Sequence, residues 1–191
     1  MVVSCACSKT TFHDMTQVIA PHPRVVVIDT DGVPLLERQA GDAVCNPGEA
    51  AVAVAAVGVL CEGGLPASEV GVISPYRAQM ALLARRLAER GLGDVEALTI
   101  DRAQGRDKTV MVVSLVRSNT QREAGRLLAD WRRINVALTR AKRKLVVVGS
   151  ASTVQSVPLF ATLVGMARER GWLVNLDRHS FRDDDYNFAS V

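Results

Sequence analysis

Residues 99–119 read TIDRAQGRDKTVMVVSLVRSN, and residues 131–150 read WRRINVALTRAKRKLVVVGS. Each stretch holds an apolar, mostly β-branched run, Val110–Val116 in the first and Leu145–Val148 in the second. Runs of this kind are typical of strands that are buried on both faces of a parallel sheet. Each run adjoins a polar element rich in Gln, Gly and Arg, as a ligand-binding loop would be. The two stretches therefore predict an α/β fold with a binding surface beside its strands.

The alternation of strands and helices continues on both sides of these stretches. Strands are predicted at 24–29, 70–73 and 95–99, and helices at 47–61, 76–90, 130–142 and 159–170. This order favours a mostly parallel, doubly wound sheet with right-handed crossovers and helices on both faces. Ligands of such sheets bind at the carboxyl ends of the strands, where Ser74–Gln79, Thr99–Asp107 and Ser118-Asn119 follow their strands.

Two of the helices begin with recognisable capping sequences. Asn46 is suited to cap the first one, Pro47 to occupy its first turn, and Glu49 to reach back as the acid of a capping box. Ser74-Pro75 repeats the same pattern at the start of the second helix.

Composition indicates one domain with an aliphatic core, because 48% of the 191 residues are hydrophobic and only 4% are aromatic. Residues 99–149 carry a net charge of +8, whereas the whole chain carries only +3. This concentration of basic charge favours a phosphate-bearing partner over an ordinary solvated surface. We expect no membrane span and no secretory signal. We also expect no metal site, since Cys5-Ala-Cys7 is too closely spaced for a zinc knuckle.

Two short motifs carry chemistry that suits a phosphate. In SPYRAQ, Arg77 and the free amides at a helix start favour an anion, although an ordinary N-cap with an exposed arginine is an alternative. In DRAQGRDK, Gly105 lets the backbone approach a phosphate, and Gln104 has groups that orient a water or a sugar hydroxyl. Asp107 is suited to accept from a ribose. The alternative here is a simple turn between two strands.

The segment RRINVALTRAKRK predicts a helix with Arg133, Ala137 and Arg140 on one face and an apolar face beside it. Such a helix would hold Arg140 rigidly, as an arginine finger that stabilises charge developing on a γ-phosphate. The alternative is a basic surface helix.

Taken in order, SPYRAQ, TIDRAQGRDKTVMVVSLVRSN and WRRINVALTRAKRKLVVVG resemble the second RecA-like motor domain of superfamily 1 helicases. The likeness is greatest to the eukaryotic replication helicase/nucleases that process Okazaki-fragment flaps, and nonsense-mediated-decay RNA helicases are near relatives. It extends from about residue 24 to residue 150. The resemblance implies a RecA-like three-layer sandwich with a mostly parallel central sheet.

The resemblance also implies residue roles. Arginine fingers for an ATP–Mg²⁺ bound by a first motor domain are assigned to Arg140 and Arg77. Other contacts to that nucleotide are assigned to Gln79, Gln104, Gly105 and Asp107. Contacts to the backbone of single-stranded DNA, with RNA possible, are assigned to Thr99, Arg117, Ser118 and Asn119. We expect the loops that carry these groups to converge on one rim of the sheet.

The chain departs from a complete motor because it has no GxxxxGK[ST] loop and no Gly-Lys dipeptide. We therefore expect negligible ATPase activity from the chain alone, as for a fragment, a truncated gene model or half of a split motor. The predicted organisation is a leader or remnant at 1–23, the motor domain at 24–172 and a charged tail at 173–191. The expected location is the nucleus, with the cytoplasm possible.

Two other functions are compatible with the sequence. A non-catalytic nucleic-acid-binding remnant of a helicase would explain the missing phosphate loop. A haloacid-dehalogenase-like phosphatase would use Asp29 as nucleophile and Asp31 as acid/base beside Mg²⁺, with 183–185 as a later acidic motif.

Overall fold

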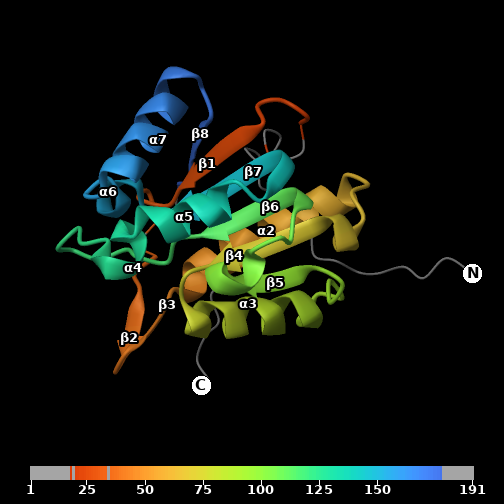
Figure 1. The fold of residues 1–191 in the computed structure, drawn as a ribbon, viewed down its shortest axis with the longest axis horizontal. Coiled ribbons are helices and arrows are strands. Elements are labelled where there is room, and N and C mark those ends of the chain that lie inside the picture. Colours follow the sequence, from red (N-terminus) through yellow and green to blue (C-terminus); the bar gives the residue numbers. More distant parts are fainter. Residues whose placement is uncertain (1–17, 19, 34, 178–191) are drawn as a thin grey trace, which may run out of the picture.

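The fold is a six-stranded, all-parallel sheet covered by helices on both faces (Figure 1). The computed structural model describes residues 18, 20–33 and 35–177. The strand order is β5-β4-β6-β7-β1-β8. The strands are β1 (Val25–Asp29), β4 (Val70–Ser74), β5 (Glu96–Thr99), β6 (Lys108–Ser114), β7 (Ala141–Gly149) and β8 (Leu173–Asn175). The predicted three-layer α/β sandwich, RecA-like in its parallel sheet, is confirmed.

Helices α2 (Pro47–Glu62) and α3 (Arg77–Glu89) cover one face of the sheet, and α5 (Trp131–Leu138) and α7 (Pro158–Glu169) cover the other. Successive residues of a strand point to opposite faces, so each strand contributes to both cores. Ile28 packs in the cluster under α2, whereas Val27 packs in the cluster under α7. The short helices α4 (Gly125–Ala129) and α6 (Ala151–Val154) lie in connections.

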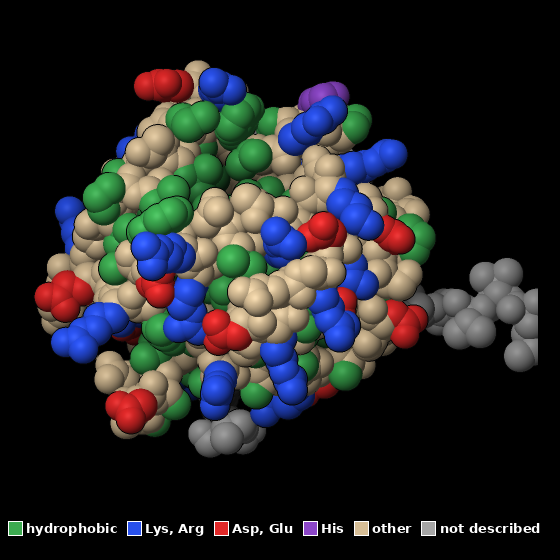
Figure 2. Space-filling view, in the orientation of Figure 1, with side chains coloured by type: hydrophobic (Ala, Val, Ile, Leu, Met, Phe, Trp, Pro, Cys, Tyr) green, Lys and Arg blue, Asp and Glu red, His purple; other side chains and the backbone are tan. Residues whose placement is uncertain are grey.

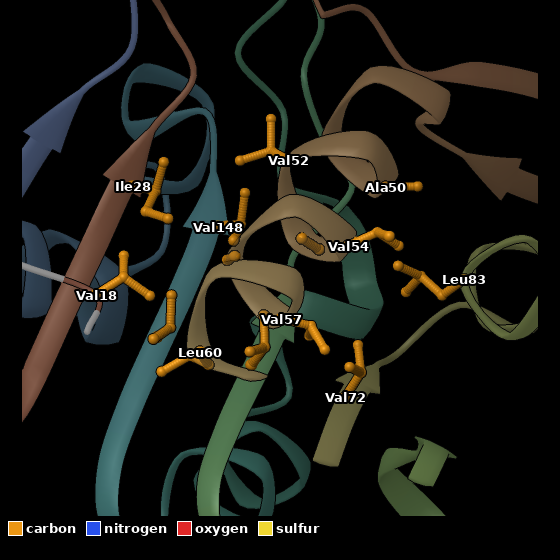
Figure 3. Packing of buried hydrophobic residues seen from close by; sticks show 14 of the residues in the cluster. Val18, Ile28, Ala50, Val52, Val54, Val57, Leu60, Val72, Leu83 and Val148 are labelled. Atoms are coloured by element: carbon orange, nitrogen blue, oxygen red, sulfur yellow. The ribbon is translucent and has the colours of Figure 1, made fainter. Parts of the chain in front are cut away.

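Helix α2 forms the centre of one core and begins where the sequence predicts. Asn46 is its N-cap, with the side-chain oxygen accepting from the Glu49 amide at 2.9 Å, and Pro47 occupies the first turn. The helix is almost entirely Ala and Val, and most of it is buried. Figure 3 shows Val54 and Val57 of this helix among side chains from the strands and from α3.

Several short elements were not predicted from the sequence. The polar connection after β1 contains a small antiparallel hairpin, β2 (Arg38–Ala40) and β3 (Ala43–Cys45), whose strands are too short and too exposed to show an apolar period. Residues 173–175, assigned to the charged tail, form β8, which pairs in parallel with β1.

Two helix boundaries also differ from the prediction. The helix expected to reach residue 142 ends at Leu138, because β7 begins at Ala141 and pairs there with Lys108 of β6. Helix α3 starts at Arg77 with Tyr76 in the N-cap position, so Ser74-Pro75 lies ahead of the cap. The Ser74 hydroxyl instead accepts a bond from the Tyr76 amide at 3.3 Å.

All six strands run in the same direction, so the sheet has a carboxyl end and an amino end. The β2–β3 hairpin, α4 and α6 lie at the carboxyl end, on the left in Figure 1. Within the described residues, no helix combines the length and apolarity that a bilayer span requires.

Candidate functional site

The predicted site residues divide between the two ends of the sheet. Gln104, Gly105, Asp107 and Arg140 lie at the amino end, whereas Arg77, Gln79, Thr99, Arg117, Ser118 and Asn119 lie toward the carboxyl end. Arg140 precedes β7 and Arg77 follows β4, and these are opposite ends in a parallel sheet. At about 3.3 Å per residue, the seven residues of β6 separate the two ends by roughly 20 Å. The expectation that all these loops share one rim is therefore wrong.

At the amino end, Arg140 is fixed by contacts on three sides of its guanidinium. Its Nη1 donates to the Asp107 carboxylate at 2.9 Å, its Nε to the Val136 carbonyl at 3.1 Å, and its Nη2 to the Thr139 hydroxyl at 3.3 Å. The residue lies beyond the end of α5 and not on its face, which corrects the predicted arrangement with Arg133. Its side chain is 23% exposed, so the structure holds a preorganised guanidinium at the surface.

The turn that carries Gly105 is anchored to the start of β5. Gly105 has φ +72°, a left-handed conformation that favours glycine, and a Cβ at this position would meet no atom within 4 Å. Arg106 pairs with Glu96, and Lys108 Nζ lies 3.2 Å from the same carboxylate. Partial burial raises the pKa of Glu96, but its bonds to Lys108 and Arg106 outweigh that effect and lower the pKa. The exposed Gln104 and Gly105 therefore lie on a turn that is held in place by the ion pairs of Arg106 and Lys108 with Glu96.

At the carboxyl end, a cavity of about 410 Å³ brings together two predicted residues and two that the sequence analysis did not place there. The predicted ones are Arg77 and Thr99, and the others are Asp101 and Arg133, whose side chains form an ion pair at 2.6 Å. Among the described residues, the guanidinium of Arg77 has no hydrogen-bond or ion-pair partner. Arg133 was expected to share a helix face with Arg140, and no local signal linked it to Asp101.

The three predicted donors that follow β6 converge on one oxygen of Glu37. Glu37 Oε2 accepts from Arg117 Nε at 3.0 Å, from the Ser118 amide at 2.7 Å and from Asn119 Nδ2 at 3.1 Å. Partial burial lowers the pKa of Arg117, but its contacts with Tyr76 and Glu37 outweigh this and raise it. These donors therefore already share an acceptor within the chain, a contact that the sequence did not indicate.

Gln79, predicted to contact the nucleotide, is completely buried instead. Its Oε1 accepts from the Asn46 amide at 2.8 Å, and its Nε2 donates to the Asn46 carbonyl and to the Ser114 hydroxyl. Gln79 thus ties α3 to the start of α2 and to the end of β6. Its role in this structure is to hold the fold together, which corrects the nucleotide-binding assignment.

Glu49 lies beside Gln79, and its side chain does not make the contact that a capping box predicts. It does not reach back to the Asn46 amide, because Gln79 already occupies that donor. Its carboxylate accepts instead from the Ser114 hydroxyl at 2.6 Å and from the Val116 amide at 2.8 and 2.9 Å. Val116 has φ +73°, which is uncommon for a β-branched residue. Glu49 therefore stabilises the strained start of the loop that presents residues 117–119.

The acids of the phosphatase hypothesis hold the loop that begins α6. Asp29 Oδ1 accepts from the Asp31 and Ala151 amides, and burial raises the pKa of Asp29. Asp31 accepts from the Ser150 hydroxyl at 2.6 Å and from the Ser152 amide at 2.7 Å. These carboxylates join β1 to the end of β7, and they are not the free pair that the phosphatase hypothesis requires. Residues 183–185 lie outside the described residues.

Comparison with known proteins gives one family match and several close relatives. The profile of a family described as "AAA domain" matches residues 3–152. The relatives include proteins named DNA replication ATP-dependent helicase/nuclease DNA2. The chain is 37% identical to the Saccharomyces cerevisiae protein over 163 residues, 43% identical to the Mus musculus protein over 146 and 38% identical to the Homo sapiens protein over 159. These alignments cover 85%, 76% and 83% of this chain, but only 11%, 14% and 15% of the respective relatives.

Proposed function

The chain belongs to the AAA-domain family, as a C-terminal helicase domain of the DNA2 type, and from this premise we propose that it is the second motor domain of an ATP-dependent DNA helicase. In this proposal its amino end faces an ATP held by a first motor domain, and its carboxyl end contacts single-stranded DNA. The observation that carries the proposal is the sorting of the candidate residues. Those assigned to the nucleotide lie at one end of the sheet, apart from Arg77 and the buried Gln79, and those assigned to nucleic acid lie toward the other.

The proposed role of Arg140 is to stabilise charge on the γ-phosphate of the ATP. A partly exposed guanidinium that is fixed by Asp107, Thr139 and Val136 matches an anion, and it needs no reorganisation when the anion arrives. Asp107 orients Arg140 and remains exposed enough to accept from a ribose hydroxyl. The Mg²⁺-bound ATP would supply the phosphoryl group, and this chain would supply the charge that stabilises its transfer.

The proposed nucleic-acid contacts come from the carboxyl-end cavity. Arg77 and Thr99 both line this cavity. The ATP is proposed to lie at the other end of the sheet, roughly 20 Å away. The guanidinium of Arg77 is therefore better placed to contact a phosphate of the nucleic-acid backbone than the γ-phosphate of the ATP. Contacts of this kind go to phosphate and sugar and carry little sequence information, so single-stranded RNA is a second ligand to test. The names of the relatives support a proposed role in DNA replication, and with it we propose a nuclear location.

The nucleotide role is tested in a chimera in which residues 20–177, which include β8, replace the matching segment of the mouse relative. We expect DNA-stimulated ATPase activity that Arg140→Ala reduces on the order of a thousandfold, as for other arginine fingers. Arg143→Ala is the matched control, because Arg143 is an exposed arginine on the neighbouring strand β7. Full activity of the Arg140→Ala chimera would contradict the proposal.

The isolated chain provides the second test. We expect it to bind single-stranded DNA in a salt-dependent manner and to show negligible ATPase activity. ATP turnover by the purified chain that disappears in Arg140→Ala would contradict the proposal that a first motor domain must hold the ATP. An inactive chimera that still binds DNA with no effect of nucleotide would favour the non-catalytic remnant.

A further inference from the structure

The two tryptophans of the chain lie in opposite environments. Trp172 is partly buried against the core under α7, and the Arg170 guanidinium lies 4.9 Å from its ring centroid. Trp131 is 60% exposed, more than any other large hydrophobic side chain among the described residues. Exposing a tryptophan forgoes a large hydrophobic gain, and it leaves the ring of Trp131 available to a ligand.

The backbone under Trp131 is rigid although its side chain is exposed. Asp130 caps α5, with its carboxylate accepting from the Arg132 and Arg133 amides at 3.2 and 3.4 Å. Ile134 is fully buried one helical turn further on. The ring is therefore attached to a fixed platform, which keeps the entropic cost of contacting a ligand low.

Trp131 is the first residue of α5, at the end of the sheet where the cavity proposed to contact nucleic acid also lies. Arg133, two residues further along α5, lines that cavity and pairs with Asp101. α5 then runs toward the amino end, where β7 begins. Figure 1 shows the start of α5 next to α4, on the side of the β2–β3 hairpin.

The charge around Trp131 favours a polyanion over an apolar protein surface. The Arg132 guanidinium lies 5.8 Å from the ring centroid of Trp131. Two further arginines lie nearby in the chain, Arg126 in α4 and Arg133 in α5. Figure 2 shows basic side chains across the middle and lower part of this face with acidic ones between them, and hydrophobic side chains gathered at the upper left. An aromatic ring next to guanidinium groups is the combination with which proteins bind the bases and phosphates of single strands.

We propose that Trp131 is a base-stacking residue for the single strand, with Arg132 beside it facing the adjoining phosphate. This inference rests on the proposed function and adds to it a contact with a base, where Arg77 and Thr99 contact only the backbone. Stacking requires only the π-face of a base, so it would hold the strand without reading its sequence.

The test compares two probes, fluorescein-labelled oligo-dT and an abasic oligodeoxynucleotide of equal length, in anisotropy titrations of the full chain. Trp131→Ala is expected to weaken oligo-dT binding on the order of tenfold and to leave abasic binding unchanged, because only the first probe has bases to stack. Trp131→Phe should retain most of the affinity for oligo-dT. In a Trp172→Phe chain, where Trp131 is the remaining tryptophan, oligo-dT should quench the tryptophan emission and the abasic strand should not.

The outcomes separate this inference from the proposed function. Wild-type chain that binds neither probe would overturn the proposed nucleic-acid contact itself. Wild-type chain that binds both probes, with oligo-dT affinity unchanged by Trp131→Ala, would overturn stacking alone. An equal loss on both probes would also overturn it, because the ring would then act through the fold or the phosphate contacts. Circular dichroism of each variant checks that the fold is intact.

Discussion

The two ends of the sheet use similar polar residues in different ways. At the carboxyl end, Asn46, Glu49, Gln79 and Ser114 are fully buried and bonded to one another. At the amino end, Asp107 is exposed and Arg140 is partly so, although the two form an ion pair. The comparison teaches that burial, more than residue type, decides whether a polar group holds the fold together or remains available to a ligand.

The largest contrast is expected between two carboxylate deletions, Glu49→Ala and Asp107→Ala. Glu49→Ala leaves the Ser114 hydroxyl and the Val116 amide without their acceptor and creates a cavity, so the free energy of unfolding should fall by about 4 kcal/mol. Asp107→Ala removes an ion pair at the surface and should cost less than about 1 kcal/mol. Urea denaturation of both variants measures the difference, and equal losses would contradict the comparison.

A smaller effect is expected on the pH dependence of stability. Burial raises the pKa of Glu49 from 4.5 to about 7, so the folded state binds more protons than the unfolded state between these values. The free energy of unfolding should therefore decrease as the pH rises from about 4.5 to 7, by up to about 3 kcal/mol from this residue. Glu49→Gln should remove this slope, whereas Asp107→Asn should keep it. A wild-type slope that persists in Glu49→Gln would assign it to another group, such as Asp29, whose pKa burial also raises.

The smallest of the three effects concerns Glu37, whose contacts lie between the buried cluster and the surface. Glu37→Gln removes the charge that Arg117, the Ser118 amide and Asn119 share, and it should lower the free energy of unfolding by about 2 kcal/mol. Hydrogen exchange at the Ser118 amide should become faster while exchange in α5 stays the same. Unchanged exchange at Ser118 would show that the backbone alone holds the loop.

Much of the fold was predictable because its signals are local. The apolar runs of β1, β4, β6 and β7 are continuous, and Asn46-Pro47 marks the start of α2 by the chemistry of a helix N-terminus. The β2–β3 hairpin and β8 were missed, because three-residue strands have no period to detect. β8 gains its structure from pairing with β1 and not from its own sequence.

The site was predictable in its residue types but not in its arrangement. The sequence by itself determined a basic segment with two buried strands and the order of motifs that places the chain in its family, because these depend on composition and local spacing. Only the tertiary structure decided which groups meet. The parallel sheet sends Arg77 and Arg140 to opposite ends, and it brings Glu49 to Ser114, 65 residues further along the chain. Such contacts depend on strand order and helix packing, which no short stretch of sequence encodes.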